Sequence, residues 1–209
     1  VVLEPRFMIV TEFVNGGTLE DLLKDAHQKL SFSQRVQIAL DVSQALEYLH
    51  SQGYIHRDLA ARNVLLKKDT NSFRACVTDF GLCVQPFDAI YNHPNNTLAR
   101  TGPVRIMAPE SLDYSINQFS KQSDVWSFGI LMYSIFSRKR PYGQATTNQV
   151  REGILKGTAV FPSYEDFEED MKHDALKQIF EACLQREPTQ RISFEEISKT
   201  LQTLLSTVQ

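Results

Sequence analysis

The chain has 209 residues, of which 42% are hydrophobic and 22% are charged, and its formal net charge is −3. This composition is that of an ordinary globular domain with enough chain for one substantial core. The charge gives no general electrostatic reason to expect a nucleic acid or an anionic membrane as a partner. Cys76, Cys83 and Cys183 form no CxxC pair, which favours free thiols in a reducing compartment over disulfides or a zinc site.

The first third of the chain has clear start and stop signals. Residues 7–14 form an apolar run typical of a β-strand, and the turn signal Asn15-Gly16-Gly17 follows it. Thr18 can cap a short helix that reaches residue 24. The pattern Ser31-x-x-Gln34 predicts a capping box, and apolar side chains recur behind it every three or four residues. We therefore expect an amphipathic helix that ends near Gly53.

The rest of the chain is predicted to be mainly helical with a small β element. Short apolar runs at 64–66 and 75–78 predict a hairpin, and residues 82–105, which show no periodicity, predict a long loop. Residues 123–136 are apolar on nearly every face, but they are far shorter than the roughly 20 residues that cross a bilayer. They therefore predict a buried helix. Further helices are expected near 146–156, near 172–185 and from the capping box that begins at Ser193.

Three short motifs follow one another in this framework. They are His56-Arg57-Asp58-Leu59-Ala60-Ala61-Arg62-Asn63, then Asp79-Phe80-Gly81, then Ala108-Pro109-Glu110. Each alone is weak evidence, but together, in this order, they match the signature set of protein kinases. The chain therefore resembles the hinge and C-terminal lobe of a eukaryotic protein kinase over essentially its whole length.

The resemblance implies an α+β kinase fold, of which residues 1–17 are the last N-lobe strand and hinge and residues 18–209 the helical C-lobe. An active kinase also needs a Gly-rich loop, a strand lysine and a helix glutamate, and none of these can be placed in this sequence. We therefore expect the chain to be part of a longer kinase domain that includes an N-terminal lobe. Alone, it is expected to bind ATP poorly and to show no useful turnover.

The resemblance also assigns the chemistry, with ATP and Mg²⁺ as cofactors. Asp58 would orient the attacking hydroxyl and accept its proton, while Arg62 would supply positive charge beside the transferring phosphoryl group. Asn63 and Asp79 would bind magnesium through oxygen atoms, which this cation prefers.

The neighbouring motif residues have supporting roles in the family. Phe80 and Gly81 would let Asp79 swing, Phe80 by packing and Gly81 by its backbone freedom. His56 could be a general base when considered alone, but at this position in kinases it packs against the motif phenylalanine, and we favour that structural role. Arg57 would receive a phosphate on the long loop, because a guanidinium binds phosphate in a fork.

Residues outside the motifs complete the expected site. In the hinge, main-chain groups of Glu12 and Val14 would bind adenine, with Thr11 guarding the rear pocket and Leu65 forming the floor. The alternative is a plain strand-to-helix turn. Structural roles are expected for three further residues. Asp124 would hold the main chain of the catalytic loop, and Glu110 and Arg191 would form an ion pair.

Two features favour tyrosine over serine or threonine as the substrate. Ala60 stands where serine/threonine kinases usually carry lysine, and the cation is Arg62 instead. Pro103 would form a platform for a long phenol side chain. Against this, Ile106 stands where tyrosine kinases typically have tryptophan, and three further positions depart from their pattern, at Tyr133-Ser134, Leu184 and Ile192. A tyrosine-kinase-like enzyme with serine/threonine specificity therefore remains an alternative.

Regulation and function class also stay open. Tyr91, Thr97 and Thr101 are candidate switch residues in the long loop, although a solvated loop tyrosine is an equal alternative. The run Arg138-Lys139-Arg140 is interpreted as a solvated face that could touch acidic substrates. A kinase-like binding or scaffolding module is the second function class, and a small-molecule phosphotransferase is disfavoured by Ala108-Pro109-Glu110. A cytoplasmic location, a protein substrate, no nucleic acid and no membrane segment in this chain complete the expectations.

Overall fold

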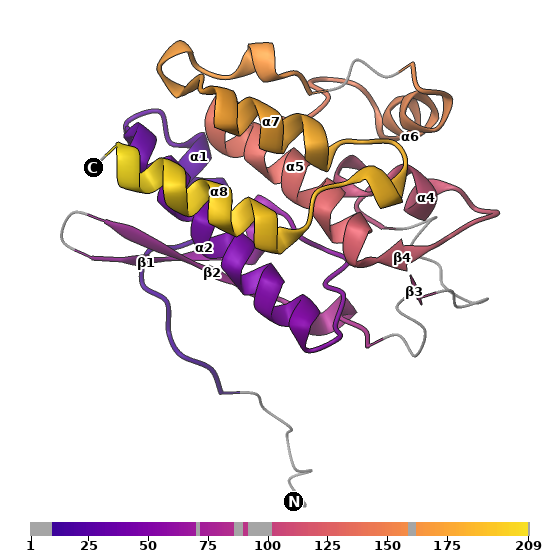
Figure 1. Ribbon diagram of the computed structural model, residues 1–209, viewed down its shortest axis with the longest axis horizontal. Helices are drawn as coiled ribbons and strands as arrows, with labels where there is room; N and C mark the ends of the chain where they lie inside the picture. The colour runs from indigo at the N-terminus through magenta and orange to yellow at the C-terminus, as the bar shows by residue number, and fades with distance from the viewer. Residues whose placement is uncertain (1–9, 70–71, 86–89, 92–101, 159–161, 209) are drawn as a thin grey trace, which may run out of the picture.

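The computed structural model describes residues 10–69, 72–85, 90–91, 102–158 and 162–208 (Figure 1). Within these ranges the α-helices are α1 (Leu19–Lys24), α2 (Phe32–Ser51), α4 (Pro109–Leu112), α5 (Lys121–Ser137), α6 (Thr147–Lys156), α7 (Asp174–Cys183) and α8 (Phe194–Thr207). The strands are β1 (Val64–Lys68), β2 (Phe73–Val77), β3 (Ile90–Tyr91) and β4 (Phe119–Ser120). The prediction of a mainly helical chain with a small β element is confirmed.

The helix starts follow the capping signals in the sequence. The Ser31 hydroxyl accepts from the Gln34 main-chain N–H, and the Gln34 side chain accepts from Ser31 N, which closes the predicted capping box of α2. Ser193 and Glu196 close the same box at α8. Such boxes satisfy main-chain donors that a helix start would otherwise leave unpaired, so they fix where each helix begins.

The helices pack in layers around α5. In Figure 1, α5 lies between α7 on one side and the pair α2 and α8 on the other. Both faces of α5 are buried, and Phe128 and Phe136 are fully enclosed. A second apolar cluster surrounds Trp126 and includes Phe119 from β4 and Val150 from α6. An apolar helix is thus stable here because neighbours cover it on every side.

The small β element is an antiparallel hairpin of β1 and β2 in which Val64 pairs with Val77. The chain before α1 attaches to its edge, because Gly16 N donates to Leu66 O at 2.7 Å and Thr18 bridges to Leu65. The strand predicted for 7–14 is wrong for residues 10–14, which are not extended in a sheet, and residues 7–9 lie outside the described ranges. Apolar composition favours a strand only where a neighbour supplies hydrogen bonds, and none pairs with 10–14 in the described structure.

The long loop predicted for 82–105 contains more regular structure than expected. Val84 bridges to Ile55, β3 pairs with β4, and Val104–Ile106 forms a 3₁₀ turn. Elements of two or three residues are too short to leave a periodic pattern in the sequence. Residues 92–101, and with them Thr97 and Thr101, lie outside the described ranges. None of the described helices has the length and apolarity that crossing a membrane requires.

Candidate active site

Asp58 is held through both oxygens of its carboxylate. One of its oxygens is paired with Arg62, and the other accepts from Asn63 Nδ2 at 2.8 Å. The same amide nitrogen also donates to the main-chain oxygen of Asp58 at 2.8 Å. A 3₁₀ turn at Ala61–Asn63 brings these two partners back toward Asp58. Asp58 is 7% exposed and both carboxylate oxygens have partners, so the direction of the carboxylate is fixed before any substrate arrives.

Asp79 is brought beside this loop by the hairpin. Thr78 N donates to Asn63 O at 2.9 Å, which extends the β1–β2 pairing by one step and sets the next residue against the catalytic loop. Asp79 adopts a left-handed backbone (φ 62°), and its Oδ1 accepts from Gly81 N at 3.3 Å. Left-handed conformations are uncommon for non-glycine residues and concentrate at functional sites. The Asp79 side chain is exposed and open to a ligand.

Asn63 and Asp79 can supply oxygen ligands to a hard cation. The Asn63 amide nitrogen makes both bonds to Asp58, so the amide oxygen is the atom left for a cation. The described residues contain no group of three or more His, Cys, Asp or Glu side chains that could hold a metal ion. A cation here would need further oxygens from water or a ligand, which is the usual situation of Mg²⁺ at phosphate sites.

Asp124 holds the main chain at the start of the catalytic loop. It is fully buried in the first turn of α5 and accepts from His56 N at 2.8 Å and from Arg57 N at 2.9 Å. His50 Nε2 lies 2.9 Å from the same carboxylate. The Asp124 contacts are those expected from the sequence. His50 was missed, because no local pattern connects a residue at the end of α2 with one that lies 74 positions further along the chain.

His56 and Arg57 contact the segment after Asp79. His56 Nε2 lies 3.2 Å from Thr78 O, and its ring centroid is 5.6 Å from that of Phe80. Phe80 is nevertheless 54% exposed, so its packing is less complete than expected. Arg57 Nε donates to Leu82 O at 2.5 Å, which gives this side chain a structural bond in addition to its predicted role.

Arg57 also lies near the candidate switch segment. Its guanidinium carbon is 5.5 Å from the Phe119 ring centroid, and Phe119 pairs with Tyr91 in the β3–β4 register. The Tyr91 side chain lies outside the described structure, so the predicted pairing of a phosphate with Arg57 stays a prediction.

The predicted hinge, residues 11–14, directly precedes the residues that attach to the edge of β1, Gly16 to Thr18. Thr11 and Glu12 are exposed, Val14 and Leu65 are half-buried, and no described residue makes a hydrogen bond to the main chain of Glu12 or Val14. The Glu12 side chain accepts from Lys67 Nζ at 2.6 Å, and this bond lowers the pKa of the Glu12 carboxyl. These main-chain groups are therefore accessible to a ligand, whereas the Glu12 side chain is occupied.

Pro103 and Glu110 lie in the segment before α5. Pro103 O accepts from Ile106 N at 3.0 Å, and Ser127 Oγ donates to Ile106 O at 2.7 Å, so α5 anchors the segment that carries the proline. Arg191 reaches Glu110 through two nitrogens, at 2.7 and 2.9 Å. Both partners are buried, which gives this pair a structural place away from Asp58.

Comparisons with known proteins agree on one family. The model described as "Protein tyrosine and serine/threonine kinase" matches residues 1–201. The chain is 34% identical to "Dual specificity testis-specific protein kinase 2" of Rattus norvegicus over 96% of this chain and 33% of that protein. It is 36% identical to "Megakaryocyte-associated tyrosine-protein kinase" of Mus musculus over 96% of this chain and 37% of that protein. "Probable serine/threonine-protein kinase gdt2" of Dictyostelium discoideum is 33% identical over 94% of this chain and 12% of that protein. The chain thus spans about a third of the length of the first relatives.

Proposed function

The chain belongs to the eukaryotic protein kinases, in the protein tyrosine and serine/threonine kinase family, and from this premise we propose that it carries the catalytic loop of an ATP-dependent protein kinase. The observation that carries the proposal is the clamped carboxylate of Asp58, which Arg62 and Asn63 hold from two sides. A base of this kind must be aimed before the substrate binds, because phosphoryl transfer depends mostly on positioning and charge neutralisation.

In this proposal each polar side chain has a separate task. Asp58 accepts the hydrogen bond of the substrate hydroxyl and takes its proton as the phosphoryl group leaves ATP. Arg62, which is paired with Asp58, also presents positive charge to the transferring group. The Asn63 amide oxygen and the Asp79 carboxylate fit Mg²⁺ because both are hard oxygen donors close to the catalytic loop. Magnesium bound there supplies positive charge that offsets the charge of the phosphates.

The nucleotide would lie against the segment at residues 11–14. Main-chain groups of Glu12 and Val14 are accessible for adenine, and Leu65 lies on the strand to which Thr18, a few residues further along, attaches. We also propose a cytosolic location, because the three cysteines are free thiols, which suit a reducing compartment.

We propose tyrosine as the hydroxyl that is phosphorylated, because of Ala60, Arg62 and the Pro103 platform. A second candidate is dual or serine/threonine specificity. It is favoured by Ile106, which departs from the usual tyrosine-kinase residue, and by two relatives whose names state dual and serine/threonine specificity. A kinase-like scaffold without turnover is the outcome that would exclude both.

The deciding experiment uses the natural full-length protein with ATP, Mg²⁺ and three peptides that differ only in having tyrosine, serine or threonine as acceptor. We expect transfer to tyrosine, and a loss of about 100-fold to 10,000-fold in kcat for Asp58→Asn, as for removal of a general base. The matched control is Asp170→Asn, an exposed acid in a 3₁₀ turn away from the loop. Transfer only to serine and threonine would replace the tyrosine proposal. Unchanged activity in Asp58→Asn would refute the assigned role.

A further inference from the structure

A cavity of about 550 Å³ lies beside the catalytic loop and has no role in the chemistry described above. One wall is formed by α1, including Glu20 and Lys24, and the opposite wall by the end of α5 and residues 138–141. Ala61, which opens the 3₁₀ turn behind Asp58, lines the cavity between these walls. The cavity therefore borders the catalytic loop at Ala61.

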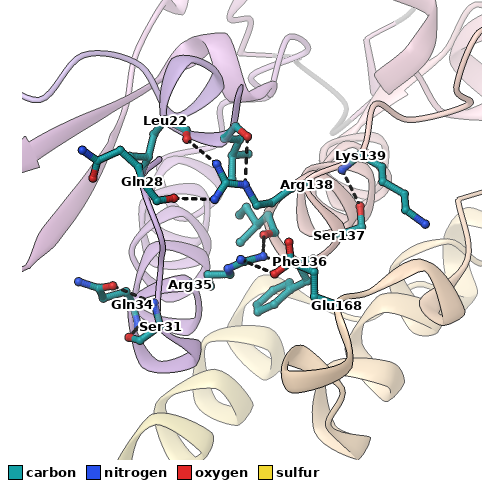
Figure 2. Close-up of polar contacts among 12 residues, drawn as sticks. Leu22, Gln28, Ser31, Gln34, Arg35, Phe136, Ser137, Arg138, Lys139 and Glu168 are labelled. Atoms are coloured by element: carbon teal, nitrogen blue, oxygen red, sulfur yellow. Dashed lines mark hydrogen bonds and ion pairs between the residues drawn. The ribbon is translucent and has the colours of Figure 1, made fainter. Parts of the chain in front are cut away.

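Arg138 fixes the wall formed by the end of α5. It is the C-cap of α5 with a left-handed backbone (φ 54°), and its guanidinium donates to four carbonyl oxygens at the end of α1 and just beyond, those of Leu22, Leu23, Asp25 and Gln28. Figure 2 shows this side chain directed toward Leu22 and Gln28, while the Lys139 side chain extends in another direction. The charge of Arg138 is therefore used to hold α1 against α5.

Two other arginines stabilise the same wall. Arg35 donates to Ile135 O at 2.9 Å and also pairs with Glu168, which anchors the last turn of α5 (Figure 2). Arg105 donates to Pro141 O at 2.7 Å and also to Ala145 O. The turn that carries Arg140 is thus tied down on both sides, so the position of Arg140 is pre-organised.

The charge of the cavity wall is positive. Among the described residues that line it, Lys24, Arg138, Lys139 and Arg140 are cationic and Glu20 is acidic. Glu20 already pairs with Lys24 at 3.3 Å, and Lys139 pairs with Asp166 at 2.7 Å.

Arg140 differs from these neighbours because it is exposed and has no ion pair with any described carboxylate. Burial lowers the pKa of the nearby Arg105 guanidinium, and the positive charge of Arg140 lowers it further. Arg140 thus adds positive charge where another cation is already close, and an anionic ligand would relieve that repulsion.

We propose that this cavity is a specificity subsite in which Arg140 binds an anionic side chain of the protein substrate, either a carboxylate or a phosphorylated residue. The proposal rests on the proposed kinase function. Ala61 is three residues from Asp58, so the cavity wall begins within about 11 Å of it. A substrate in extended conformation advances about 3.3 Å per residue. Four residues in extended conformation span about 13 Å, so a side chain within about four positions of the phosphorylated hydroxyl can reach the cavity wall at Ala61.

The test scans a single glutamate, and in a second arm a single phosphoserine, along the four positions on each side of the acceptor in an otherwise neutral peptide. Each peptide is compared with its glutamine or serine counterpart by kcat/KM in the full-length protein. We expect a preference of about fivefold at one or two positions, which is the upper range for an exposed ion pair. The preference should fall to about onefold in Arg140→Gln and reverse in Arg140→Glu. The control Lys199→Gln removes an exposed cation from α8 and should keep it.

Each outcome decides the proposal. A preference that disappears in Arg140→Gln and persists in Lys199→Gln supports the subsite, and the arm with the larger effect identifies the anion. Equal kcat/KM at all positions, or a preference that Arg140→Gln leaves unchanged, overturns it. If the wild-type protein phosphorylates nothing, fluorescence anisotropy with the same peptides gives the answer instead. Tighter binding of the anionic peptides that depends on Arg140 then supports the subsite while the kinase function fails, and equal binding overturns the subsite.

Discussion

Single residues at this site act mainly on the main chain. Asp124 accepts two main-chain N–H groups of the catalytic loop, and Asn63 donates to the main-chain oxygen of Asp58. Arg138 binds only carbonyl oxygens in the contacts described above. Such bonds fix the path of the chain, and the direction of the reactive side chains follows from it. Substitutions at these positions should therefore disturb the geometry of the site more than its charge.

Gly16 offers a residue-scale test of how the segment at 11–17 is held. A Cβ at Gly16 would lie 2.2 Å from Leu66 O, whereas a Cβ at Gly17 (φ +74°) would have no heavy atom within 4 Å. We expect Gly16→Ala to push the segment off β1 at a cost of about 1–3 kcal/mol. Gly17→Ala should add only left-handed strain of about 1 kcal/mol.

Hydrogen exchange of the Leu66 amide, which donates to Gly17 O at 2.9 Å, measures this directly. Protection should fall by about tenfold or more in Gly16→Ala and by less in Gly17→Ala. Equal protection in the two variants would show that the close approach of Gly16 to β1 does not hold this segment.

At the scale of elements, Asp41 joins α2 to the hairpin. Asp41 is 6% exposed, and its carboxylate accepts from Ala75 N of β2 at 2.8 Å and from Gln37 at 2.7 Å and lies 3.1 Å from Arg74. Burial raises the pKa of Asp41 despite these bonds and the nearby guanidinium. The Asp41 carboxylate thus has hydrogen-bond partners for both oxygens, yet ionising it in the folded state costs free energy.

This raised pKa predicts a pH dependence of stability. The folded protein keeps the Asp41 proton to higher pH than the unfolded chain does, so this contribution is fully present below the unfolded pKa and is lost as pH rises through the folded pKa. Asp41→Asn removes the titration and leaves an oxygen to accept from Ala75 N. Urea unfolding of wild type and variant from about pH 4 to about pH 7 should therefore show wild type losing stability relative to Asp41→Asn as pH rises. Asp170→Asn, which removes an exposed acid, is the control, and a difference of opposite sign in Asp41→Asn would contradict the prediction.

At the scale of the whole molecule, interactions that are local in sequence could be predicted from patterns, whereas distant contacts could be predicted only where the family resemblance implied them. The capping pairs at Ser31 and Ser193 set helix starts from residues three positions apart. Three contiguous motifs, of which one contains Asp58, together identified the kinase family, which the comparisons confirm. The contacts of His50 with Asp124 and of Arg105 with Pro141 join residues far apart in the chain. They depend on packing that no local pattern encodes. The strand predicted at 7–14 failed over residues 10–14 for the same reason, since a strand requires a distant partner.

The ion pair of Glu110 with Arg191, a distant contact that the resemblance implied, connects the segment before α5 to the turn before α8. Both side chains are buried, and Arg191 also donates to Gln122 O at 2.9 Å and stacks 5.1 Å from the Trp126 ring centroid. Arg191→Met leaves a buried carboxylate without its partner, which should cost about 3–5 kcal/mol of unfolding free energy. Glu110→Leu combined with Arg191→Met should cost clearly less than the sum of the single changes, because neither charge is then left alone.

Urea unfolding followed by the fluorescence of Trp126, the single tryptophan of the chain, measures the free energies of this double-mutant cycle. Trp126 is a suitable reporter because it lies against Arg191. The milder Arg191→Lys, which keeps the charge and loses the forked contact, serves if Arg191→Met does not fold. The exposed pair Glu152 and Lys156, at 3.0 Å, is the matched control, and its coupling should stay below about 0.5 kcal/mol. Additive costs at Glu110 and Arg191 would show that the contact does not connect the two segments energetically, and the segment that carries Pro103 would then depend on α5 alone.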